Sequence, residues 1–292
     1  MSSHLNSAEN ETAHNIFTNT MADMKWTDIK QHAEENAIVL LPIAVIEQHG
    51  PHLCLATDIY TAHILRLSVK RIFAEKGYAS IIAPPFYWGI NQAGRGFPGS
   101  FNIRAETMQA LLFDILTSLK EFGFTQVFGI NWHNDIEHRA AAMNAFRDAC
   151  EQLEITACFP HDDFWMPDTL GIHSSDPCCY TIEPPVKQFS KAPVWDVHGG
   201  DMETAVVHAY YPHLVDTEKA ASLPDIPLAD GKFEDWMFGG ALRQLSPQGY
   251  LGSPSSYGSF DVPGFVEDNA RRIVDAIITR LNRDEENGGS QP

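Results

Sequence analysis

The features of a secreted or membrane protein are missing from this chain. No apolar run approaches the roughly 20 residues that a transmembrane helix needs. The stretch from Met1 to Thr20 is polar and lacks the apolar core of a secretory signal. The 5 cysteines form no CxxC pair, so neither a disulfide framework nor a thiolate zinc site is indicated. We therefore expect a cytoplasmic protein that enters no membrane.

Positive charge is also scarce. The chain has 20 Lys and Arg against 38 Asp and Glu, which gives a formal net charge of −18. Such a chain is poorly suited to binding nucleic acid or an anionic membrane through non-specific electrostatics. It suits a small neutral or cationic substrate, and bound divalent cations that offset part of the charge.

Motifs of nucleophilic and phosphate-binding sites are absent as well. There is no GxSxG elbow, which argues against serine catalysis. The Gly-rich stretch from Gly89 to Ser100 lacks the strand–GxxxxGKS/T–helix context of a phosphate loop. Because glycine lets the backbone approach a ligand closely, we expect this stretch to form a mobile wall of a substrate pocket.

The length of 292 residues and the 44% hydrophobic content allow a sizeable core in one large domain. We divide the chain into a polar leader over 1–24, a domain over 25–282 and a disordered polar tail over 283–292. The segmentation follows composition, since both ends are polar and no repeat or long linker interrupts the middle.

Apolar runs typical of strands alternate with stretches of helical spacing. The predicted strands cover 37–45, 78–84, 124–131 and 154–159, and the predicted helices cover 59–76, 106–122, 136–153, 202–211 and 265–281. Continuous apolar strands separated by helices indicate a single-domain, three-layer α/β fold with a central, mainly parallel sheet flanked by helices. Ligands bind beyond the carboxyl ends of such strands, so the segments that follow the strands should converge on one site.

A first candidate cluster follows the first predicted strand. Glu47 and His49 stand two residues apart, so their side chains point the same way in an extended chain. Asp58 returns at the start of the next helix. Glu, His and Asp together are ligands for zinc or manganese. A polar loop with a hydrogen-bonded histidine is the simpler interpretation.

A second cluster, the run NWHND, ends the strand 124–131 and supplies His133 and Asp135. Asn134 or Asp135 could instead cap the following helix. Because the fold gathers strand ends, two such clusters favour a metal site, and their acids and histidines suit two metals that share a bridging carboxylate. His138, one turn later, is expected on the solvated surface.

A third cluster is the run WDVHGGDMET over 195–204. His198 precedes a helix that Glu203 would help to start. A histidine oriented by a carboxylate is a plausible proton shuttle. Capping by Asp201 together with a buried His198 is the alternative.

Further residues in these segments are candidates for binding substrate. Trp132 and Trp195 could form flat pocket walls, although buried core tryptophans fit equally well. Asn91 and Asp196 are the polar candidates. His161, which follows the last predicted strand, is expected to add only surface polarity.

In these blocks the sequence resembles the creatininase (creatinine amidohydrolase) family. The matching runs are LP at 41–42, EQHGPHLCLATD at 47–58, GFPGS at 96–100, NWHND at 131–135 and HGGDMET at 198–204. Their order and approximate spacing agree from about residue 25 to 280. The resemblance implies an α/β fold around a largely parallel sheet and a hydrolase with two divalent metals per chain. The metals would be zinc, with manganese as the alternative at one site, and the chain would form a homo-oligomer, commonly a hexamer.

The resemblance also assigns roles, residue by residue. The metal ligands carried over by motif are Glu47, His49, Asp58 and His133. Asp58 would bridge the metals. Asp135 stands where creatininase has a Glu that completes the second metal site, and Glu203 matches a family Glu near the metals, so either could complete it here. His198 matches the proton-transfer histidine of the family.

We therefore expect an amidohydrolase in which a hydroxide held between two metals attacks a small, creatinine-like cyclic amide. His198 would pass a proton to the leaving nitrogen, with Glu203 orienting the imidazole. The departures from the family lie in substrate-facing segments. Asn91 and Gly94 stand where relatives have Ser with a nearby His, and Trp132 stands where relatives usually have Gly. These departures weaken the case for creatinine itself.

Two alternatives stay open. The first keeps the metals but changes the bond, as in family members that hydrolyse a formamide or open a cyclic diketone by C–C cleavage. Arg95 is the only basic residue of the pocket loop, which argues against a phosphorylated substrate. The second alternative is a non-catalytic metal-binding partner protein, against which His198 and Glu203 argue because a structural site needs no proton shuttle.

Overall fold

A twisted parallel sheet forms the centre of the computed structural model, which describes residues 15–162, 173, 175–228 and 242–288. Within these residues the strand order is β2-β1-β3-β4-β5, and every neighbouring pair is parallel. The strands are β1 (Ile38–Ile43), β2 (Ser80–Ile82), β3 (Gln126–Asn131), β4 (Thr156–Asp162) and β5 (Cys179–Ile182). The predicted parallel sheet is confirmed.

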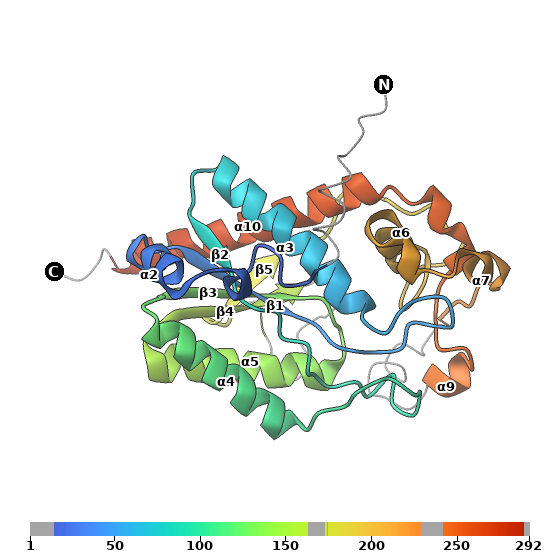
Figure 1. Ribbon diagram of the computed structural model, residues 1–292, viewed down its shortest axis with the longest axis horizontal. Coiled ribbons are helices and arrows are strands. Elements are labelled where there is room, and N and C mark those ends of the chain that lie inside the picture. The colour runs from blue at the N-terminus through green and yellow to red at the C-terminus, as the bar shows by residue number, and fades with distance from the viewer. Residues whose placement is uncertain (1–14, 163–172, 174, 229–241, 289–292) are drawn as a thin grey trace.

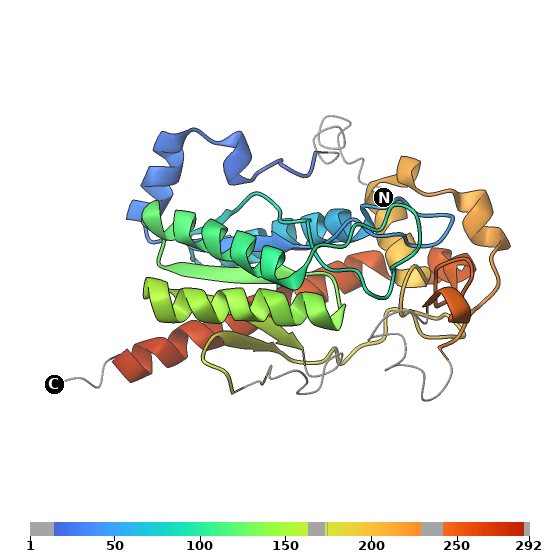
Figure 2. The ribbon, with the colours of Figure 1, turned by 90° about the horizontal axis from the view of Figure 1, so that it is seen from below.

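Helices cover both faces of the sheet (Figures 1 and 2). One face carries α3 (Thr57–Glu75) and α10 (Val262–Gly288), and the other carries α4 (Ala105–Glu121) and α5 (Ile136–Leu153). A shorter helix, α2 (Trp26–Glu34), packs beside α4. The three layers match the predicted α/β architecture. No described helix combines the length and the apolar composition that crossing a membrane would require.

The packing of strand β1 explains why the strands of this sheet are continuous apolar runs in the sequence. Val39 and Leu41 pack into the core under α4 and α5, while Ile38 and Leu40 pack into the core under α3 and α10. Alternate residues of a strand point to opposite faces, so a strand covered on both faces must be apolar throughout.

The remaining helices gather at the carboxyl end of the sheet (Figure 1). They are α6 (Asp201–Tyr210), α7 (Thr217–Ser222), α9 (Leu242–Leu245) and the 3-10 turns η2 (Pro212–Leu214) and η3 (Pro254–Ser259). A further 3-10 turn, η1 (Met21–Asp23), directly precedes α2 in the chain. Helix α6 packs on α3 through Val206 and Leu65.

Both predicted chain ends differ from the structure. Thr20 and Met21, assigned above to a leader, are buried, and Thr20 forms a parallel bridge with Ile82. Helix α10 continues to Gly288, past the predicted boundary at 282. Residues 1–14 and 289–292 lie outside the described part of the chain. Strand β5 was not predicted, because only a short apolar run precedes the prolines at 184–185.

The strand order also locates the site. The connection after β1 leads outward to β2 on one side, whereas β3 lies on the other side of β1. At such a reversal the loops that leave two neighbouring strands separate, and a crevice opens at their carboxyl ends. The first two candidate clusters follow β1 and β3, the two strands that flank this crevice.

Candidate metal centre

The loop after β1 and the first turn of α3 bring three predicted ligands together. Glu47, His49 and Asp58 are 2%, 1% and 2% exposed. The Glu47 N–H donates to the carbonyl of Leu55 at 2.9 Å, which folds the loop back, and Gly50 adopts a φ of 78° at the turn. His133, which follows β3, and Glu203, on the first turn of α6, reach the same place.

Two groups of potential ligands share one carboxylate. Glu47, Asp58 and His133 form one group, and His49, Asp58 and Glu203 form the other; the ligand atoms within each group lie within 4.8 Å of one another. Asp58 Oδ1 is 3.1 Å from His49 Nε2, while Asp58 Oδ2 is 3.2 Å from His133 Nδ1. The carboxylate of Asp58 therefore lies between two candidate metal positions.

The hydrogen bonds around the histidines fit metal ions. His133 Nε2 lies 2.9 Å from the Ile90 carbonyl oxygen, and His49 Nδ1 lies 3.0 Å from the Glu47 carbonyl oxygen. Carbonyl oxygens only accept, so these nitrogens carry hydrogen. In a neutral ring the opposite nitrogen then presents a lone pair to the carboxylates, which is the usual arrangement of metal-ligating histidines.

The surroundings of Asp58 Oδ2 show that the cluster of histidines and carboxylates requires a cation. It is buried and has no hydrogen-bond partner among the described residues. A lone pair on His133 Nδ1 facing this oxygen would be repulsive, so a cation must lie between them. In the metal-free protein the cation is a proton; a divalent ion fits the same donors, because imidazole and carboxylate suit zinc or manganese.

The pKa values of the cluster agree with this need for a cation. Burial raises the pKa of Glu47 to about 7, although His133 opposes the shift. Burial alone would lower the pKa of His133, but the contact with Asp58 and the charge of Glu47 raise it to about 9. Burial likewise opposes protonation of His49, yet Glu203 and Asp58 hold its pKa well above the ordinary value.

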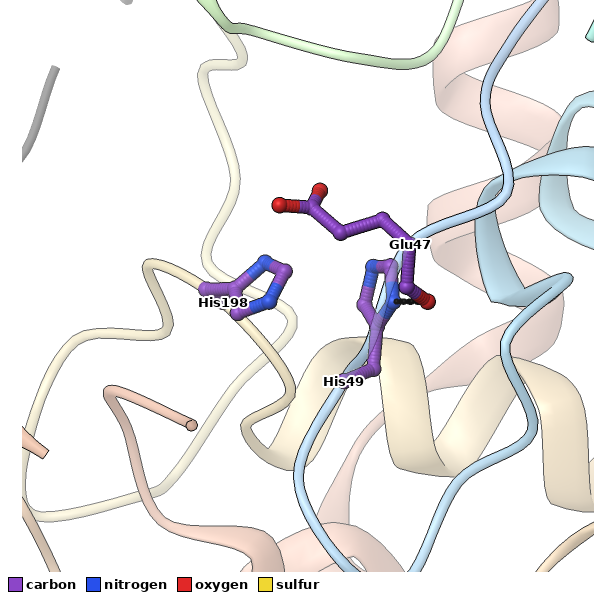
Figure 3. A group of neighbouring side chains, drawn as sticks. All are labelled: Glu47, His49 and His198. Carbon is purple, nitrogen blue, oxygen red and sulfur yellow. Dashed lines mark hydrogen bonds between the residues drawn. The ribbon is translucent and has the colours of Figure 1, made fainter. Parts of the chain in front are cut away.

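His198 completes a third group with Glu47 and His49 (Figure 3). Its ring centroid lies 4.3 Å from that of His49. Its Nε2 lies 2.7 Å from the carbonyl oxygen of Gln48, so Nε2–H donates there and Nδ1 carries the lone pair. Burial and the charge of His49 lower the pKa of His198 to about 3, which keeps the ring neutral.

The expected pairing of His198 with Glu203 is not what orients the imidazole. No hydrogen bond joins these two described residues. Glu203 Oε2 instead accepts from the Gly199 N–H at 2.6 Å, and Glu203 Oε1 lies 3.7 Å from His49 Nε2. The orienting group is the backbone carbonyl of Gln48, which side-chain patterns do not reveal although Gln48 lies within the first sequence block.

Asp135 caps α5 and joins neither metal-ligand group of the described residues. Its Oδ1 accepts from the N–H groups of Glu137 at 3.0 Å and His138 at 3.3 Å. Its Oδ2 accepts from the N–H groups of Gln92 at 2.6 Å and Ala93 at 3.4 Å. Both oxygens are occupied, so the helix-capping interpretation is the one that the geometry supports.

A cavity of about 520 Å³ opens beside the cluster. Its wall includes Trp132 and Trp195, and Trp195 is 50% exposed. Asp196 also lines it, but the carboxylate of Asp196 accepts from the backbone N–H groups of residues 200, 202 and 203 and so shapes the start of α6. Asn91 is not among the lining residues, because its Nδ2 donates to the carbonyls of residues 46 and 101.

Two expectations about surface histidines are wrong. His138 is 0% exposed, its Nδ1 accepts from the Ile90 N–H at 3.3 Å, and its ring lies edge-on to His133 at 5.0 Å. His161 is buried because β4 continues to Asp162. Both are polar residues that become buried through their positions on α5 and β4.

The Gly-rich stretch packs against the cluster. A Cβ at Gly94 would lie 2.3 Å from Glu47 Oε1, and Ser100 Oγ accepts from the Gln48 N–H at 3.1 Å. The absence of a side chain at position 94 is therefore what allows the Glu47 carboxylate to lie where it does.

Gly94→Ala should weaken binding of divalent metal. The new Cβ would lie 2.3 Å from Glu47 Oε1 and would therefore displace the buried Glu47 carboxylate from its place in the cluster. Metal content after dialysis, measured by elemental analysis, should fall below that of the wild type. Gly258→Ala is the matched control, because a Cβ there meets nothing within 4 Å. Unchanged metal content in folded Gly94→Ala protein would contradict this account.

Comparison with known proteins agrees with the geometry. The model of the creatininase family, described as creatinine amidohydrolase, matches residues 22–277. A mycofactocin precursor peptide peptidase of Mycolicibacterium smegmatis is 27% identical over 221 residues, which are 75% of this chain and 75% of that protein. Creatinine amidohydrolase of Pseudomonas putida is 24% identical over 216 residues, 70% of this chain and 76% of that protein.

Solved structures show the same fold. A crystal structure of creatinine amidohydrolase (creatininase) superposes with a TM-score of 0.60 at 21% identity, covering 89% of this chain and 96% of that one. A structure named creatininase Mn gives a TM-score of 0.59 at 21% identity, covering 89% and 97%, and a creatininase variant described as the Zn-Zn type gives 0.59 at 21%, covering 88% and 96%. With the family model spanning most of its length, this chain belongs to the creatininase family.

Proposed function

We propose that this protein is a two-metal hydrolase of amide C–N bonds. The observation that carries the proposal is the position of Asp58, whose two carboxylate oxygens face His49 and His133 at 3.1 and 3.2 Å. Glu47, Asp58 and His133 would hold one divalent ion, and His49, Asp58 and Glu203 the other. Zinc or manganese suits these donors, and relatives of the same fold are described as Mn and Zn-Zn forms.

The bound ions would activate a water molecule and polarise the carbonyl group of the substrate. The chain itself supplies positioning and proton transfer. The Gln48 carbonyl holds Nε2–H of His198, so Nδ1 is left to take a proton and deliver it to the leaving nitrogen. Trp132 and Trp195 form apolar walls that limit water around the substrate.

A small cyclic amide is the first substrate candidate, in line with the creatinine amidohydrolase relative. A peptide or another linear amide is the second. Two observations favour it: the cavity of about 520 Å³ offers far more room than one small ring needs, and the peptidase relative is 27% identical. A non-catalytic metal-binding role is disfavoured, because a structural site would not need His198 beside an open cavity.

Metal stoichiometry tests the assignment of ligands. The wild type should bind about two zinc- or manganese-type ions per chain. Asp58→Ala should lose both because the two groups share this carboxylate, and Glu203→Gln should lose one. Asp135→Asn, which keeps a capping side chain, should retain both. Elemental analysis of the four proteins measures this, and loss of an ion in Asp135→Asn with retention in Glu203→Gln would reverse the assignment.

Two substitutions distinguish a residue that binds metal from the residue that transfers the proton. His133→Ala should lose metal and activity together, whereas His198→Ala should keep metal and lose activity by about 100-fold or more. A panel of cyclic amides, peptides, formamides and cyclic diketones, assayed with metal-loaded protein, identifies the bond that is cleaved. Equal metal loss in the two variants would refute the division of roles.

The affinity for the divalent ion held by Glu47, Asp58 and His133 should rise with pH. At pH 7 the metal-free protein holds a proton on His133, whose pKa is about 9, and about half a proton on Glu47, whose pKa is about 7. A divalent ion needs both groups deprotonated and so displaces these protons. From pH 7 to 9 the affinity should therefore increase about tenfold per unit, and more steeply below pH 7. Calorimetric titration of the metal-free protein with Mn²⁺ measures this; an affinity independent of pH would show that the ion binds elsewhere.

A further inference from the structure

One arginine in the cavity wall, Arg139, has no counter-ion among the residues that the structure describes. Arg139 lies on the first turn of α5 and lines the cavity between the carboxyl ends of β3 and β4. It is 3% exposed. The proposed chemistry gives this side chain no role.

The hydrogen bonds of Arg139 leave most of its donors unused. Nη1 donates to Asn134 Oδ1 at 3.2 Å and Nη2 donates to the Pro160 carbonyl at 3.1 Å, while Nε has no partner among the described residues. A guanidinium offers five N–H donors, so two neutral acceptors satisfy a minority of them. Of the carboxylates in the described part of the chain, Asp162 acts on Arg139 only at longer range, and none forms an ion pair with it.

The other arginine that lines the cavity, Arg272, is partly buried and shows the difference. Arg272 forms an ion pair with Asp268 at 2.8 Å, and its Nη atoms donate to the Glu183 carbonyl and to Asn269 Oδ1. Each of its three nitrogens donates to an acceptor of the protein, and one of these acceptors is a carboxylate. A buried cation without such a partner is unfavourable, since neutral acceptors do not replace a counter-charge at low dielectric.

We propose that Arg139 binds a carboxylate of the substrate, so that the substrate is an amide with a free carboxylate close to the scissile C–N bond. N-acyl amino acids and the C-terminal ends of short peptides have this chemistry. This inference rests on the proposed amide hydrolysis. The C–N bond breaks, the water oxygen joins the acyl carbon, and a proton goes to the nitrogen of the fragment that carries the carboxylate.

Position and charge support this ligand class. Asn134, the acceptor of Arg139 Nη1, directly follows His133, so the anion site adjoins the metal cluster. A planar guanidinium matches a carboxylate in a bidentate pair. Arg139 forms no ion pair within the described residues and has the carboxylates of Asp135 and Asp162 nearby, so it suits a single negative charge better than a phosphate dianion.

Matched ligand pairs test the proposal. The probes are N-acetyl amino acids and dipeptides, each compared with its C-terminal amide, on metal-loaded full-length protein. Binding is measured by calorimetry and turnover by release of the free amine. The wild type should prefer the carboxylate form by about 10–100-fold, as expected for a charged hydrogen-bonded pair.

Substitutions identify the side chain that is responsible for the carboxylate preference. Arg139→Gln should abolish the preference, and Arg139→Lys should restore part of it, with circular dichroism and metal content unchanged in both. Arg272→Gln should keep the preference. A preference that survives in Arg139→Gln would place the carboxylate on the metals and overturn the proposal, as would equal binding of acid and amide by the wild type.

The outcomes also separate this inference from the proposed function. Carboxylate preference in binding that depends on Arg139, without turnover of any probe, would support the anion site and count against amide hydrolysis. Turnover of both members of each pair at equal rates would support amide hydrolysis and refute the anion site.

Discussion

The carboxylate of Asp58 lies between a ring nitrogen of His49 and a ring nitrogen of His133, and the rest of the site is arranged around this contact. The arrangement is stable only with positive charge between the groups, supplied by protons or by divalent ions. Burial makes the requirement strict, because water cannot screen the repulsion. The pKa values of Glu47, His49 and His133 are raised for the same reason, so these groups retain protons until a metal ion replaces them.

Backbone carbonyls fix the histidines around that carboxylate. Ile90 orients His133, Glu47 orients His49 and Gln48 orients His198, each by accepting from one ring nitrogen. These carbonyls belong to the loops that follow β1 and β2, and the sheet fixes where those loops begin. The parallel sheet therefore sets both where the side chains lie and which nitrogen of each ring faces the cluster.

Much of the site could be predicted from the sequence, because its blocks follow apolar strands that periodicity identifies. Glu47, His49, Asp58 and His133 were predicted to meet, and they do. The choice between Asp135 and Glu203 could not be made in this way, since either carboxylate fits the pattern. It depends on the N–H groups of Gln92 and Ala93, more than 40 positions before Asp135, which occupy one of its oxygens.

The sequence by itself determined the α/β class, the parallel sheet and the residue types of a metal cluster, because strand periodicity and motif spacing are local properties. Tertiary structure alone decided the burial of His138 and His161 and the orientation of His198. It also decided that Arg139 lines the cavity without a counter-ion in the described part of the chain. Each of these depends on which distant segment covers a residue, and the order of amino acids along one segment carries no such information.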